Sequence, residues 1–87
     1  MSTFLLKVIT REGERLSRDV VSVDVPAARG RLTVLARHQR LVCRVLPGVV
    51  KVVDASGARE AWDVAGGALQ VEPAETTLLV PRATRRD

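Results

Sequence analysis

The residue types that most often carry out chemistry are scarce in this sequence, which has one histidine, His38, and one cysteine, Cys43. His38 lies in the polar stretch 37–40, where a lone imidazole usually serves as a surface or capping group rather than as a general base. Cys43 lies in an apolar run, where a thiol usually packs as a small hydrophobe. A single cysteine forms neither an internal disulfide nor, by itself, a metal site. We therefore expect no catalytic residue, no metal and no cofactor.

Two other features bear on ligand binding. Gly66 and Gly67 could cradle a phosphate, but they open a strand pattern, with no Gly-x-Gly-x-x-Gly motif and no Lys-Ser/Thr pair. The acidic residues are scattered over expected turns and outer faces, where solvation explains them: Asp54, Glu60, Asp63, Glu72 and Glu75. Neither feature predicts a nucleotide site or an acid–base pair.

The charge of the chain is basic, with a net value of +4 carried by twelve arginines and two lysines against ten acids. Arginine suits carboxylate and phosphate partners. The charge therefore indicates either a surface that meets something acidic or a solvated face, and both interpretations stay open. A nucleic-acid platform would need aromatic side chains on which bases stack. Only Phe4 and Trp62 are available, far apart in the sequence, which argues against one.

Composition indicates a single all-β domain. A chain of 87 residues builds one domain with a thin core. Valine dominates its apolar residues, and β-branched side chains pack better on a pleated surface than on a helix. No stretch approaches the roughly 20 apolar residues that span a bilayer, and the first residues do not resemble a signal peptide. The single cysteine fits a reducing cytosolic compartment.

Alternating apolar residues divide the chain into short strands. Between residues 19 and 26, Val21, Val23 and Val25 should share one buried face. The segment 41–46 would also suit one face of a helix, but neither flank offers a helix cap, so a strand is favoured. The expected strands are 4–10, 19–26, 32–34, 41–46, 49–53, 58–64, 68–71 and 76–80.

Glycine and proline mark the turns between these strands: Pro47, Gly48, Gly57, Gly66 and Gly67. Gly57 should supply a positive φ in a hairpin. Residues 82–87 follow a closing proline and read as a polar tail, so the expected domain spans residues 1–81.

The order of these residues resembles the epsilon subunit of F-type ATP synthases, called delta in mitochondria. The family pattern is Gly-Glu-Leu-Gly-Ile-x-Pro-Gly-His-x-Pro-Leu-Leu-Thr, followed shortly by Pro-Gly. This chain reads Gly-Arg-Leu-Thr-Val-Leu-Ala-Arg-His-Gln-Arg-Leu-Val-Cys over residues 30–43, with Pro-Gly in place at 47–48. Downstream, the family's Ser-Gly-Gly-x-Leu-x-Val corresponds to residues 65–71. The match needs no gap, and ordered motifs are more specific than any one of them.

The resemblance implies a flattened β-sandwich of about ten short, mostly antiparallel strands. It also implies a non-catalytic subunit of the central rotor stalk, which couples c-ring rotation to the gamma subunit and the catalytic head. The implied partners are gamma and the c-ring, with no cofactor and no nucleic acid. The implied location is the cytoplasmic face of a bacterial membrane, as a peripheral part of the complex. The coupling ion, proton or sodium, stays open, and the isolated domain is expected to be a monomer or weak dimer.

Positions carried over from the family give candidate contact residues. The c-ring-facing set is Ala28, Arg29, Gly30 and Arg31, and the gamma-facing set is His38 and Cys43. Arg31 replaces an acidic residue of the family pattern, and like charges across a contact are costly. We therefore expect an acidic or neutral residue in the opposing loop of the cognate c-subunit.

Two further expectations concern the length of the chain and an alternative function. Family members usually continue into a C-terminal helical hairpin, and this chain reads as a short form that stops where the sandwich should end. The alternative function is a stand-alone basic β-module that binds nucleic acid or an acidic protein, which would be recognised by selective, salt-sensitive retention on polyanions.

Overall fold

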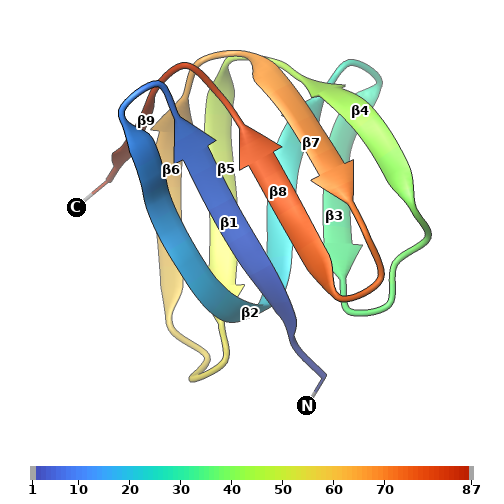
Figure 1. Cartoon of the computed structure of the whole chain (residues 1–87). Coiled ribbons are helices and arrows are strands. Elements are labelled where there is room, and N and C mark those ends of the chain that lie inside the picture. Colours follow the sequence, from blue (N-terminus) through green and yellow to red (C-terminus); the bar gives the residue numbers. More distant parts are fainter. Residues whose placement is uncertain (1, 87) are drawn as a thin grey trace.

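A computed structural model describes residues 2–86 and shows two layers of β-strands packed face to face (Figure 1). The described residues contain no helix, and so none long and apolar enough to cross a membrane. The expected all-β sandwich is confirmed, with nine strands in the described part rather than about ten. The strands are β1 (Phe4–Thr10), β2 (Gly13–Ala27), β3 (Gly30–Leu35), β4 (Leu41–Val45), β5 (Gly48–Asp54), β6 (Arg59–Val64), β7 (Gly67–Val71), β8 (Glu75–Leu79) and β9 (Ala83–Arg85).

Strand β2 belongs to both layers. Its first half pairs with β1, and its second half lies between β3 and β5. One layer therefore runs β2–β1–β8–β7–β4 and the other runs β3–β2–β5–β6–β9. Figure 1 shows β2 curving from the front layer into the back layer. Pairing is antiparallel except between β1 and β8, which run parallel, so the mostly antiparallel arrangement is confirmed.

A β-bulge in β2 interrupts the expected alternation of buried and exposed side chains. Val23 and Val25 are buried as expected, but the third fully buried valine is Val20, and Val21 is only half-buried. The register against β5 shifts between Val20 and Ser22. The extra residue reverses the side-chain alternation at this point and increases the local bend. The prediction for Val21 was wrong because strict alternation assumes an unbroken ladder.

The core between the layers is built almost entirely from aliphatic side chains. Phe4 and Trp62 are its only aromatic members, and its largest fully buried residues are leucines and valines. Each buried valine or leucine stabilises the fold by about 1.5–3 kcal/mol relative to exposure. The fully buried side chains are Leu6, Leu69, Leu78, Val8, Val20, Val23, Val25, Val34, Val45, Val50, Val52 and Val71.

The hairpin between β5 and β6 follows the expected turn chemistry. Gly57 has a φ of +88°, as predicted. The Asp54 carboxylate accepts hydrogen bonds from the Ser56 N–H at 2.9 Å, the Ala58 N–H at 3.0 Å and the Ser56 hydroxyl. The Ser56 side chain is the main cause of a lowered pKa for Asp54.

The end of the chain differs from the expected polar tail. Residues 83–85 form β9, which pairs with β6 and buries Ala83 opposite Val64. Arg86 holds Asp63 through a pair of 2.8–2.9 Å hydrogen bonds, and the same contact lowers the pKa of Asp63. The sequence pattern does not predict this short strand, because only one of its three residues is apolar. Asp87, the last residue of the expected tail, lies outside the described residues, as does Met1.

Gly67, where β7 begins, packs directly against the backbone at the end of β8. A Cβ at this position would overlap the carbonyl oxygen of Leu79 and crowd the Val80 side chain. At Gly48, by contrast, an added Cβ would lie 3.2 Å from a ring carbon of Pro26.

We therefore expect Gly67→Ala to destabilise the domain by about 1–3 kcal/mol, the usual range for forced overpacking. Gly48→Ala should cost less, because its neighbour needs to move by only a few tenths of an ångström. Urea unfolding followed by Trp62 fluorescence compares the two variants. Equal stability of Gly67→Ala and the parent chain would contradict this packing.

Candidate protein-binding surface

The candidate c-ring-facing residues form one exposed hairpin between β2 and β3. Ala28 and Arg29 make the turn, and all four residues of the set are exposed. Gly30, with a φ of +116°, allows the chain to return into β3. The structure therefore places this whole set together at one end of the sandwich (Figure 1).

Arg31 turns back onto its own domain instead of projecting from this hairpin. Its Nε donates to the Asp24 carboxylate at 3.1 Å, and its Nη2 donates to the carbonyl oxygens of Val49 at 2.7 Å and Asp24 at 3.2 Å. Arg29 takes part in no ion pair within residues 2–86. The free positive charge of the hairpin is therefore that of Arg29, whereas the charge of Arg31 is paired with Asp24.

The hairpin shares its end of the sandwich with most of the expected turns. The Leu46 N–H donates to the Pro26 carbonyl at 2.8 Å and ties the β4–β5 connection to β2. Pro47 lies in this connection and Gly66 in the β6–β7 turn, and both line one shallow hollow of about 370 Å³. Gly48 and Gly67 are the first residues of β5 and β7 rather than turn residues. Gly57 lies in the hairpin at the other end of β5.

His38 precedes β4 in the β3–β4 loop, whereas Cys43 is the middle residue of the strand. His38 is in the β3–β4 loop, half-buried, with its Nδ1 2.8 Å from the Gln39 carbonyl oxygen. Cys43 packs inward against the core, and burial raises the pKa of its thiol. It lines a hollow of about 310 Å³ together with the Ala28–Arg31 hairpin and Arg44. The structure thus brings Cys43 to the candidate ring-facing set and leaves His38 at the far end.

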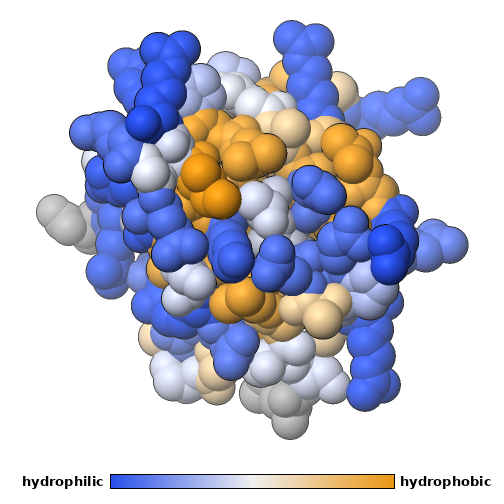
Figure 2. Space-filling model, in the orientation of Figure 1, coloured by the Kyte–Doolittle hydropathy of each residue, from blue (hydrophilic) through white to orange (hydrophobic). Residues whose placement is uncertain are grey.

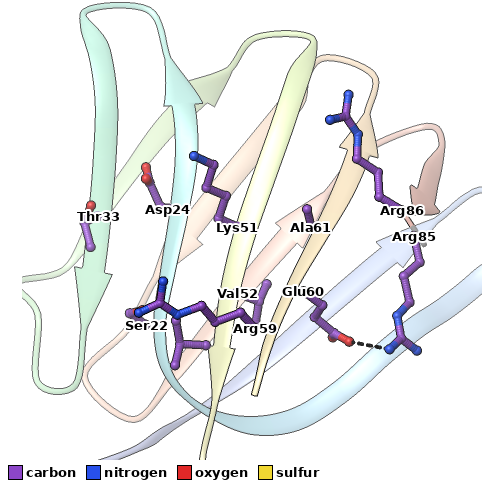
Figure 3. Close-up of a pocket in the computed structure, with 11 residues that line it drawn as sticks. Ser22, Asp24, Thr33, Lys51, Val52, Arg59, Glu60, Ala61, Arg85 and Arg86 are labelled. Atoms are coloured by element: carbon purple, nitrogen blue, oxygen red, sulfur yellow. Dashed lines mark ion pairs between the residues drawn. The ribbon is translucent and has the colours of Figure 1, made fainter. Parts of the chain in front are cut away.

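A hollow of about 760 Å³ lies on the outer face of β2, β5 and β6 (Figure 3). Lys51 and Arg59 line it without an ion pair among the described residues, whereas Arg85 is paired with Glu60. Its lining contains neither His38 nor Cys43. Within residues 2–86, no three His, Cys, Asp or Glu side chains gather as a metal site would require.

Exposed apolar side chains lie on both layers and were not anticipated from the sequence. Val42 on β4 is 74% exposed and Leu35 on β3 is 54% exposed. Leu79 on β8 is 43% exposed, and Figure 2 shows apolar surface between the charged side chains on the face formed by β1, β8 and β7. Strand alternation could have identified Val42, because it precedes the inward-facing Cys43. Such side chains favour contact with another protein.

A family model for the ATP synthase delta/epsilon chain β-sandwich domain matches residues 3–86. The chain belongs to this family. It is 36% identical over 85 residues to the ATP synthase epsilon chain of Bordetella petrii, and 39% identical over 80 residues to that of Mesorhizobium japonicum. These matches cover 98% and 92% of this chain but 60% and 59% of the relatives. The chain thus spans less than two thirds of the curated relatives it matches.

Chains in two solved ATP synthase structures share the fold. A chain of the Euglena gracilis mitochondrial ATP synthase, in a structure of OSCP/F1/c-ring, superimposes with a TM-score of 0.92 at 20% identity. That match covers 98% of this chain and 54% of the other. A chain from the Tetrahymena thermophila central stalk and c-ring gives a TM-score of 0.79 at 14% identity, covering 94% and 66%. At these identities the likeness establishes the β-sandwich.

One departure from the epsilon-family pattern has a structural consequence. Arg37 stands where that pattern has the glycine of Pro-Gly, and its φ is +63°. It is the one non-glycine residue among 2–86 with a positive φ. For a residue with a Cβ, this left-handed conformation costs about 1–2 kcal/mol.

We expect Arg37→Gly to raise the stability of the domain by up to about 1 kcal/mol, since relief of the strain exceeds the added entropy of the unfolded chain. Arg40→Gly, in the same loop but without a positive φ, serves as the control and should lower stability. Thermal unfolding of the two variants distinguishes them. A decrease for both would show that the Arg37 backbone is not strained.

Proposed function

We propose that this chain is a non-catalytic subunit of the central stalk of an F-type ATP synthase, which couples rotation of the c-ring to the gamma subunit and the catalytic head. Family membership over residues 3–86 is the observation that carries the proposal. The fold is also that of chains in two ATP synthase structures that include the c-ring. In a bacterial cell this role places the chain at the cytoplasmic face of the membrane, held there by the complex.

The hairpin Ala28–Arg31 is the proposed contact with the c-ring. A coupling element must pass on force without bending, and this hairpin is braced by the three hydrogen bonds of Arg31. Because Arg31 is neutralised by Asp24, the charge offered to the ring is that of Arg29. The compensating acidic residue of the cognate ring loop is therefore expected opposite Arg29.

The loop that carries His38, together with β4, is the proposed contact with gamma. On β4, the Val42 side chain points outward and the Cys43 side chain points into the core. At this part of β4, Val42 rather than Cys43 would therefore contact gamma. β4 also ends beside the Ala28–Arg31 hairpin. One continuous surface can thus connect the gamma contact to the ring contact. The proposed role needs no bond chemistry, because torque is transmitted through packing and hydrogen bonds.

The test is binding of the labelled chain to a detergent-solubilised subcomplex of the cognate gamma subunit and c-ring. We expect Arg29→Glu to weaken binding about fivefold to tenfold, since reversing a partly exposed charge costs about 1 kcal/mol. Arg59→Glu makes the same charge change on the side of β6 that lines the large hollow and should bind like the parent chain.

Failure of the folded parent chain to bind the subcomplex would contradict the proposed function. Equal weakening by Arg29→Glu and Arg59→Glu would instead show that only net charge matters and that the hairpin is not the contact.

A further inference from the structure

Strand β3 has a partner on one side only. It pairs with β2 from Gly30 to Leu35, and none of the other strands of residues 2–86 pairs with it. It is thus the edge strand of its layer, six residues long. The opposite edge strand, β9, has only three residues and is followed by the Arg86–Asp63 contact.

Proline fixes which backbone groups of β3 face the open side. Pro26 has no N–H, and its carbonyl accepts from Leu46 on the other side of β2, so the pair of Pro26 with Arg31 is not hydrogen-bonded. In an antiparallel ladder, bonded and non-bonded pairs alternate. The N–H groups of Arg31, Thr33 and Leu35 therefore point away from β2. The Leu35 carbonyl, used by the His38 N–H, points the same way.

This edge lacks the usual protection against strand pairing. Exposed edges are normally blunted by charged side chains, proline or a covering segment. Here the residues with outward amides include the exposed Thr33 and Leu35, the latter 54% exposed. The charge of Arg31 is folded back onto Asp24. The Leu35 carbonyl already accepts from the His38 N–H, so an added chain would pair mainly through the N–H groups of Arg31, Thr33 and Leu35.

The two ends of β3 carry unpaired positive charge. Arg29 precedes the strand and Arg37 follows it, and neither takes part in an ion pair within the described part of the chain. A second copy paired antiparallel to β3 would bring Arg29 of one molecule toward Arg37 of the other. A copy paired parallel would bring like arginines together. Both arrangements are repulsive, so the charges select an acidic partner.

We propose that the free edge of β3 is a strand-addition site for an extended segment of the gamma subunit that has an acidic residue at the end beside Arg37. Strand addition supplies affinity through backbone hydrogen bonds and specificity through alternate side chains. Gamma is the chosen occupant because β3 leads directly into the His38 loop, so this inference rests on the proposed function. The edge extends that contact along the strand, and Leu35 provides its apolar part.

Amide hydrogen exchange of the isolated chain and of its complex with the cognate gamma subunit tests the proposal. In the isolated chain, the Thr33 and Leu35 amides should exchange quickly, while Leu32 and Val34, bonded to β2, should be protected. In the complex, Thr33 and Leu35 should slow by about tenfold or more, as expected for newly bonded strand amides. Leu32 and Val34 should change little.

The outcomes are distinct. A complex in which Thr33 and Leu35 keep their free exchange rates overturns strand addition and leaves the proposed function standing. If the isolated c-ring or a nucleic acid slows exchange of the Thr33 and Leu35 amides and gamma does not, gamma is not the segment that pairs with β3. No binding to gamma contradicts the proposed function and this inference together.

A variant pair gives a second readout. Thr33→Pro removes one outward N–H that makes no bond to β2, and Thr33→Ala removes only the hydroxyl. Provided that unfolding shows Thr33→Pro to be folded, we expect it to bind gamma at least tenfold more weakly than Thr33→Ala. Equal binding by the two folded variants would overturn the proposal.

Discussion

The bend in strand β2 is the constraint on which the rest of this structure depends. One strand supplies hydrogen bonds to both layers, and the bulge between Val20 and Ser22 lets it change layers while Val20 and Val23 remain in the core. The second half of β2 then carries Asp24, which anchors Arg31. It also carries Pro26, which accepts the Leu46 N–H. The binding hairpin and the β4–β5 connection are thus fixed by the same strand that closes the sandwich.

Ion pairs within the domain neutralise many of its arginines, so the net positive charge does not by itself predict binding to a polyanion. Half of the twelve arginines form ion pairs within the domain: Arg15, Arg18, Arg31, Arg40, Arg85 and Arg86. The Glu60 carboxyl, whose side chain is 9% exposed, is shared by Arg18 of β2 and Arg85 of β9 and closes the seam between the layers. Among the arginines left unpaired, Arg29, Arg37 and Arg44 lie around β3 and β4. Charge complementarity there would govern association rate and partner choice more than affinity.

Much of the fold could be predicted from local pattern. The pattern predicts strand 4–10 at its observed bounds, and it favours a strand over a helix at 41–46, where β4 spans Leu41–Val45. The positive φ of Gly57 followed from hairpin chemistry. The features that the sequence pattern does not predict are those that depend on tertiary contacts. The bulge at Val21 depends on the layer change of β2, and β9 depends on β6 as a partner for a segment with little apolar character. The pairing of Arg31 with Asp24 joins residues seven positions apart across a hairpin, which single-strand periodicity does not reveal. The contact residues for the ring and gamma came from family resemblance and stay predictions.

The most direct measurement is a cryo-electron microscopy map of the rotor assembled from this chain with its cognate gamma subunit and c-ring. The account predicts the sandwich at the junction of stalk and ring, with the Ala28–Arg31 hairpin against the ring loops and β4 beside gamma. A map in which the domain is bound with that hairpin in solvent, or in which the assembled rotor carries no density for it, would contradict the account.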